Sequence, residues 1–157
     1  NPDNSSDVLG LRQFESDCAK LKFTAIPAPM RKSEEIPAVF NILKRDKAQG
    51  LIVTGNSTNS ALRETIIEQV AKHRLAAVYS TSLFTDAGGL LSYGTNNPDL
   101  FRRAAAYADK IFKGAKPGDL PIVQPIKFEM VLNLKTAKAL GIKIPDMVLV
   151  QVTKVIE

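Results

Sequence analysis

Residues 50–70, GLIVTGNSTNSALRETIIEQV, decide the fold because a strand, a polar loop and a helix follow one another there. The first residues form a short apolar run, which is typical of a strand buried on both faces of a parallel sheet. The polar loop 54–59 comes next, and Leu62, Ile66 and Val70 then recur at the spacing of one helix face. The stretch therefore predicts one strand–helix unit of an α/β fold.

The same alternation extends toward both ends of the chain. Further strands are predicted at 22–26, at 75–79, at 90–93 and within 122–132. Further helices are predicted to begin at the capping residues Asn4, Ser33 and Asn97, and a short one is predicted at 135–140 with Gly141 as its C-cap. The last segment, 147–156, fits either a helix or a strand. This pattern predicts a three-layer α/β/α fold with a mostly parallel sheet.

Two of the predicted helices carry large apolar residues on one side. Leu9, Phe14 and Leu21 mark the apolar side of the first helix. Ile111 and Phe112, together with several alanines, mark the inner face of the long helix in the second half of the chain. We expect both of these sides to pack against the core.

The composition argues against several classes of protein. Lys and Arg number 21 against 16 Asp and Glu, but the basic residues are scattered and Trp is absent, so no nucleic-acid partner is expected. No run of about eighteen apolar residues occurs, so no membrane span is expected. Cys18 and His73 are each the only residue of their type, which leaves no internal disulfide and no Cys/His metal site.

Common enzyme motifs are absent from the sequence. There is no Gly-x-Ser-x-Gly elbow, no phosphate loop ending in Gly-Lys-Ser or Gly-Lys-Thr, and no Gly-x-Gly-x-x-Gly fingerprint. His73 lies near a predicted helix end, where it complements the helix dipole. The chain is therefore not expected to be an enzyme, and neither a cofactor nor a catalytic residue is assigned.

Polar segments at the predicted strand ends and helix starts are the candidate ligand-binding positions. In open parallel sheets, ligands bind outside the carboxyl ends of the strands, and hydroxyl and amide groups suit a small polar solute. The candidate residues are Asn4, Ser5, Ser6, Thr54, Asn56, Ser57, Ser80 and Tyr93. The same residue types also form helix caps and turns, and Tyr93 equally fits a core or interface position, so both interpretations stay open.

Several long stretches of the chain resemble one known family. They are AKHRL at 71–75, AGGLLSYG at 87–94, DLFRRAA at 99–105, DKIFKGAKP at 109–117, KFE at 127–129 and NLKTAKALG at 133–141. In this order they resemble the ABC transporter substrate-binding family of the type I periplasmic-binding-protein fold. The resemblance covers essentially the whole chain and rests on many residues rather than on one short motif.

The resemblance implies a two-lobed receptor that closes on its ligand. It implies the extracytoplasmic solute-binding component of an ABC importer, which captures a small polar solute, such as an amino acid or a related acid, and passes it to a membrane permease. The implied location is periplasmic or extracytoplasmic, with a signal peptide removed or lying outside this chain. The alternative is a ligand-sensing domain of a regulator or receptor with the same fold.

Three positions of the family carry over to this chain. Asn4, Ser5 and Ser6 match a polar helix start, Thr54, Asn56 and Ser57 match a Thr-Asp-Asn-type loop, and Ser80 matches a loop that lines the cleft. The chain departs from the family at Gly55, which stands in the acidic position of that loop. This departure weakens the expectation that the loop contacts the α-ammonium group of an amino acid.

The resemblance also implies a division of the chain. We expect 1–89 to be the C-terminal ligand-binding lobe without its first strand, and 90–157 to hold the hinge crossing, the returning segment and the C-terminal tail. A lobe without its first strand has an open sheet edge and only half of a cleft. We therefore expect the isolated chain to bind ligand weakly or not at all, and to form a homodimer or exchange strands.

Overall fold

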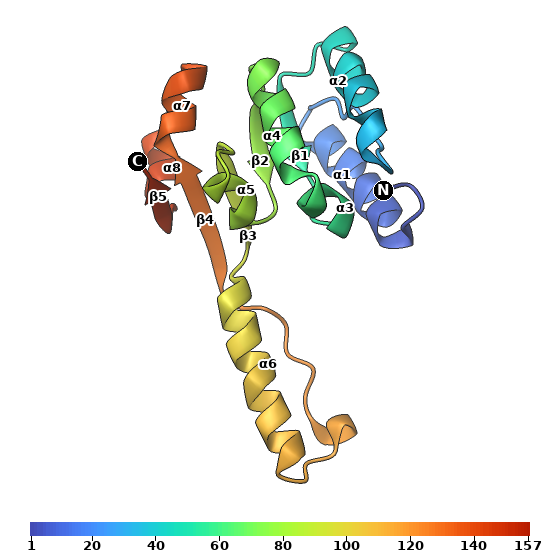
Figure 1. The fold of residues 1–157 in the computed structure, drawn as a ribbon, viewed down its shortest axis with the longest axis vertical. Coiled ribbons are helices and arrows are strands. Elements are labelled where there is room, and N and C mark those ends of the chain that lie inside the picture. The colour runs from blue at the N-terminus through green and yellow to red at the C-terminus, as the bar shows by residue number, and fades with distance from the viewer.

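The computed structural model describes all 157 residues as an α/β chain (Figure 1). The helices are α1 (Ser5–Lys20), α2 (Ile36–Arg45), α3 (Ser57–Ala61), α4 (Arg63–Lys72), α5 (Ser82–Asp86), α6 (Asn97–Phe112), α7 (Leu134–Leu140) and α8 (Asp146–Leu149). The strands are β1 (Gly50–Val53), β2 (Ala76–Tyr79), β3 (Leu91–Thr95), β4 (Phe128–Asn133) and β5 (Lys154–Ile156). Short 3₁₀ turns occupy Ser33–Glu35 and Pro117–Asp119.

The five strands form one sheet in the order β1-β2-β3-β4-β5. β1 and β2, β2 and β3, and β4 and β5 pair in parallel, whereas β3 and β4 are antiparallel. The predicted α/β class with a mostly parallel sheet is therefore confirmed. The antiparallel pair arises because the chain leaves β3 through α6 and comes back along β4 in the opposite direction.

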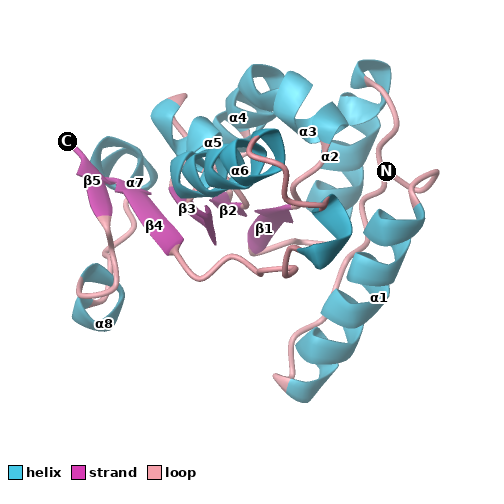
Figure 2. Cartoon of the chain, turned by 90° about the horizontal axis from the view of Figure 1, so that it is seen from below, coloured by secondary structure: helices cyan, strands magenta, loops and turns pink.

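One face of the sheet is covered by α2, α4 and α5, whereas α8 lies on the other side (Figure 2). The main core lies under these three helices and consists of Ile36, Phe40, Leu43, Val53, Ile66, Val70, Ala77, Tyr79 and Phe84. The predicted helix face is confirmed here, since Ile66 is 5% exposed and Val70 is 6% exposed. A second, smaller hydrophobic cluster lies at the β4 side of the sheet and consists of Leu90, Leu132 and Ala137.

The predicted strand at 22–26 does not form. Residues 24–30 make no backbone–backbone hydrogen bond, and the adjacent Pro27 and Pro29 have no N–H group to offer a ladder. The segment instead packs Ile26, Ala28 and Met30 against the main core, and 23–30 and β1 together line a groove of about 1420 Å³. The prediction was wrong because β-structure needs a paired neighbour, and none lies within hydrogen-bonding distance.

The apolar sides of α1 and α6 are also less buried than the sequence predicts. Leu9 and Leu21 of α1 are 63% and 67% exposed, and Phe112 of α6 is 88% exposed. Figure 1 shows why: α6 and the segment that returns from it form an arm that projects away from the sheet. The α1 side that carries Phe14 lines the open groove instead of a packed core.

Local hydrogen bonds and backbone geometry show where the predicted helices begin and end. The side chain of Asn96, and not that of Asn97, caps α6 by accepting a hydrogen bond from the Asp99 N–H. Gly141 ends α7 in the left-handed conformation (φ 72°), as predicted. The final segment contains both a helix and a strand, since α8 is followed by β5.

No helix combines the length and the apolar character that a bilayer crossing requires.

Two side-chain contacts join the start of the α6 arm to residues 127–129, where the chain re-enters the sheet through β4. The Asn96 amide donates to Glu129 Oε2 at 2.9 Å, and Lys127 Nζ donates to Asp99 Oδ1 at 2.8 Å. The hydrogen bond from Lys127, followed by the charges of Arg103 and its neighbour, holds the pKa of the Asp99 carboxyl below its ordinary value. Asp99 therefore stays ionised at neutral pH and fixes the chain at the point where it leaves and re-enters the sheet.

Candidate functional site

The start of α1 is organised by the side chain of Asn4. Its Oδ1 atom accepts hydrogen bonds from the N–H groups of Ser6 at 2.9 Å and of Asp7 at 3.3 Å, which satisfies two donors that a helix start otherwise leaves free. The side chains of Ser5 and Ser6 are exposed. Asn4 thus acts as a helix cap, and the two serine hydroxyls stay open to solvent.

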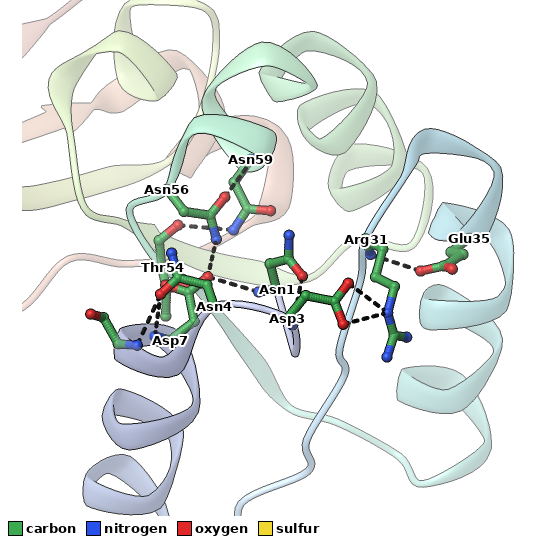
Figure 3. A network of polar contacts seen from close by, with 10 residues as sticks. Asn1, Asp3, Asn4, Asp7, Arg31, Glu35, Thr54, Asn56 and Asn59 are labelled. Carbon is green, nitrogen blue, oxygen red and sulfur yellow. Dashed lines mark hydrogen bonds and ion pairs between the residues drawn. The ribbon is translucent and has the colours of Figure 1, made fainter.

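The loop after β1 is closed by a second asparagine cap. Asn56 Oδ1 accepts from the Asn59 N–H at 2.7 Å and so starts α3. Asn59 Nδ2 in turn donates to the Thr54 carbonyl at 2.9 Å, and Asn56 Nδ2 donates to Asp7 Oδ2 at 3.0 Å. Figure 3 shows these contacts joining the start of α1 to the loop. The loop conformation is therefore fixed from both sides before any ligand binds.

Ser80, at the end of β2, packs closely against Gly55 on one side and Gly94 on the other. A Cβ placed on Gly55 would lie 2.7 Å from Ser80 Oγ, and a Cβ on Gly94 would overlap the Ser80 carbonyl oxygen. Ser80 Oγ is buried and has no hydrogen-bond partner. Because β1, β2 and β3 run parallel, their carboxyl ends meet at one edge of the sheet, and a free hydroxyl lies there between two glycines.

Tyr93 is placed differently from the other predicted residues. Its side chain is 54% exposed and stacks on Phe128 of β4, with the ring centroids 5.9 Å apart. It makes no hydrogen bond to the loops described above. The structure thus brings the α1 start, the loop after β1 and Ser80 to one edge, whereas Tyr93 faces the antiparallel neighbour strand.

Three further polar residues lie at this edge, and of these only Asp7 was outside the polar segments that the sequence indicates. Asp7 and Asn59 support the loop after β1, and Thr81 Oγ1 is buried without a partner beside Ser80. Thr81 follows a predicted strand, so the same rule that indicated Ser80 indicates it as well. Asp7 gives no such signal, because its partner Asn56 is distant in the sequence and an acid in a first helical turn has an ordinary structural explanation.

The electrostatic character of the edge is mostly neutral. Burial raises the pKa of Tyr79 to about 12, so this phenol, whose ring stacks on Phe84 inside the main core, stays protonated at neutral pH. His73 ends α4, contacts the Gln69 carbonyl through Nδ1 at 2.8 Å and lies 5.0 Å from the Phe40 ring, which gives it a structural place away from this edge. The edge can hydrogen-bond a small polar molecule through hydroxyls and one carboxylate.

The chain is similar to one protein family and to several solved structures. A family model described as ABC transporter substrate binding protein matches residues 1–156. A conserved domain protein from Vibrio cholerae shares 21% identity at a TM-score of 0.85, over 99% of this chain and 52% of that one. The ABC domain from Streptococcus pneumonia, solved in complex with L-Trp, shares 24% identity at a TM-score of 0.85, over 98% and 52%.

A third similar structure is an open, ligand-free substrate binding protein with adhesive properties from Clostridium difficile. It shares 18% identity at a TM-score of 0.70, over 98% of this chain and 51% of that one. A search of curated proteins finds no match. The chain spans about half the length of the solved structures that it matches, and these structures support the fold described above.

Proposed function

The chain belongs to the ABC transporter substrate binding protein family, and from this premise we propose that it forms one half of an extracytoplasmic receptor for a small polar solute. The receptor captures the solute, an amino acid or a related acid, between two lobes and delivers it to the membrane permease of an ABC importer. Within this proposal, 1–89 belongs to the ligand-binding lobe, and 90–157 crosses the hinge and returns.

The buried free hydroxyl of Ser80 is the observation that carries the proposal. A buried polar group without a partner is costly, and a solute that hydrogen-bonds to it recovers that cost. Ser80 lies at the carboxyl edge of the sheet, where ligands of open α/β folds bind. The L-Trp complex of the Streptococcus pneumonia domain, which has the same fold, supports an amino acid as the solute class.

The solute proposal is tested on the full-length protein that contains these residues. A thermal-shift screen against L-amino acids and related acids should reveal at least one ligand, since a solute at 100 times its dissociation constant adds roughly 2.7 kcal/mol of stability. For that ligand, Ser80→Ala should weaken the affinity about tenfold in isothermal titration calorimetry, because one hydrogen bond is lost. Ser16→Ala, at an exposed site on α1, is the matched control.

Stabilisation by none of these solutes would count against the solute proposal. If a ligand is found and Ser80→Ala binds it with unchanged affinity, the binding site does not include the end of β2.

We also propose that the isolated chain self-associates through the outer edge of β1. This strand pairs only with β2, and its Ile52 side chain is 54% exposed. An unpaired edge with an exposed apolar side chain favours pairing with a second chain. Light scattering at about 20–50 μM protein should give the mass of a dimer, because weak edge pairing becomes visible at such concentrations. The Ile52→Lys variant should give the mass of a monomer. A monomeric mass for the unaltered chain would refute this expectation.

A further inference from the structure

We propose that one end of the molecule docks on the surface of an anionic phospholipid bilayer through a cluster of exposed lysine and arginine side chains. The inference rests on the proposed function only for the presence of a bilayer, because the permease that receives the solute lies in one. The candidate solute site lies at the carboxyl ends of β1 to β3, whereas this cluster lies at their amino ends. Both surfaces can therefore be occupied at the same time.

The cluster, called the basic end below, consists of the last turns of α2, α4 and α7 and the residues that follow them, which are 41–49, 69–75 and 138–143. The helices α2 and α4 end shortly before β1 and β2 begin, so their ends lie at the amino ends of these strands. β4 runs antiparallel to β3 and leads directly into α7, which brings α7 to the same end. Figure 1 shows the three helix ends at the top, opposite the α6 arm, and Arg74 Nη2 lies 3.5 Å from the Ala139 carbonyl oxygen.

The positive charge of the chain is concentrated at the basic end. Its three segments hold seven Lys and Arg residues against one Asp, whereas the rest of the chain holds 14 basic and 15 acidic residues. The basic end alone thus carries a charge of +6, compared with +5 for the whole chain. These residues are far apart in the sequence, and only the fold brings them together. They are Lys44, Arg45, Lys47, Lys72, Arg74, Lys138 and Lys143.

Most of these basic side chains have no acidic partner. Arg45 alone forms an ion pair, with the adjacent Asp46 at 2.7 Å. Four lysines elsewhere in the chain, by contrast, each pair with an Asp at 2.8–2.9 Å. All seven basic residues of this end are exposed. An anionic surface can therefore meet six of them without first breaking an ion pair.

The helix dipole explains only part of the basic end. The basic residues within the last helical turns complement the dipole, so they have an ordinary structural explanation. Lys47 and Arg74 lie beyond the helix ends in the left-handed conformation, each with φ 53°. This conformation is strained for a residue with a Cβ, and after α7 it is taken by Gly141. Local structure thus disfavours a basic residue at both positions, whereas binding to an anionic surface accounts for it.

The kind of basic residue favours a bilayer over a single shaped anion. Five of the seven are lysines, whose ammonium groups are point charges on flexible stems and lack the paired donors with which arginine fits one phosphate or carboxylate. Charges of this kind, spread over three helix ends, suit a surface of many mobile anionic head groups. Each basic residue near such a surface raises the affinity by a factor of about five.

Vesicle sedimentation tests the basic end on the full-length protein that contains these residues. The probes are phosphatidylcholine vesicles that contain about 30% phosphatidylglycerol, and vesicles of phosphatidylcholine alone, at about 50 mM salt. The protein should partition about 100-fold better onto the anionic vesicles. Raising the salt to about 500 mM should remove this preference, because the charges are exposed and are screened.

A double substitution at the two strained positions removes charge without harming the fold. Glycine suits the left-handed backbone, so Lys47→Gly combined with Arg74→Gly should unfold at no lower temperature than the unaltered protein. Its partition coefficient on the anionic vesicles should fall about 25-fold, a factor of about five for each charge. Lys110→Gln combined with Lys116→Gln, which removes two exposed charges from the α6 arm at the opposite end, is the matched control and should change this coefficient less than about threefold.

The outcomes separate bilayer docking from solute binding. Equal partition onto both kinds of vesicle, or onto neither, overturns the inference and leaves the proposed function standing, because the thermal-shift screen involves no lipid. Equal losses in the two double variants also overturn it, since the charge of the whole protein and not the basic end would then be responsible. Retention on a polyglutamate resin without vesicle binding would assign the basic end to an acidic protein instead. The expected vesicle results with no ligand in the solute screen would support bilayer docking and remove the proposed function alone.

Discussion

Gly94→Ala should lower the free energy of unfolding by about 3 kcal/mol, because the added methyl group has no space. A Cβ at Gly94 would overlap the carbonyl oxygen of Ser80, which belongs to the backbone and cannot rotate away. Relief would require β3 to move away from the end of β2, where the two strands pair over only a short register. Urea unfolding followed by circular dichroism measures the loss.

A second glycine provides the control with the opposite sign. Gly10 lies inside α1 with nothing within 4 Å of its Cβ position. Gly10→Ala should therefore stabilise the chain by about 0.5–1 kcal/mol through the higher helix propensity of alanine. Equal effects of the two substitutions would show that Gly94 is not tightly packed against Ser80. Since Ser80 is the proposed ligand contact, Gly94→Ala should also weaken solute binding in the full-length protein.

Leu132→Ala should cost about 3 kcal/mol, because the side chain is completely buried and its removal leaves a cavity. Leu132 lies on β4 between β3 and β5 and packs in one cluster with Leu90 and Ala137. The midpoint of urea unfolding should fall while the slope stays unchanged, since the extent of the folded region is the same.

Val150→Ala is the matched control for this substitution. Val150 is 82% exposed and directly follows α8, so its truncation should change the free energy of unfolding by less than about 0.5 kcal/mol. A loss below about 1 kcal/mol for Leu132→Ala would mean that the small cluster around β4 unfolds separately from the main core. The expected large loss would place both clusters in one cooperative unit.

Local chemistry explains which parts of the fold could be predicted from the sequence. The cap at Asn4, the αL glycine at Gly141 and the common helix face of Ile66 and Val70 all depend on residues within one or two turns. Such features follow from backbone geometry and from hydrogen bonds to near neighbours, so the sequence alone is enough. The predicted cap at Ser33 was wrong. Ser33 is the first residue of a 3₁₀ turn whose N-cap, Lys32, makes no side-chain hydrogen bond, and α2 begins only at Ile36.

Long-range packing explains the predictions that failed. The apolar segment 22–26 has the composition of a strand but no partner within reach, so it runs beside the groove without a ladder. Phe112 has helical spacing, yet α6 projects from the sheet and leaves it exposed. Periodicity shows which side of an element is apolar, but it does not show whether another element covers that side.

The candidate site also combines features that the sequence predicts with features that only the tertiary structure shows. The sequence by itself placed Thr54, Asn56 and Ser80 at the ends of strands, because polar residues directly follow apolar runs. Only the tertiary structure decided that Asp7 meets Asn56, across an interval of 49 residues, and that Ser80 lies between two glycines. The physical reason is that a strand end is a local property, whereas the charge and the free hydroxyl of a site depend on which strand ends and helix starts the sheet brings together.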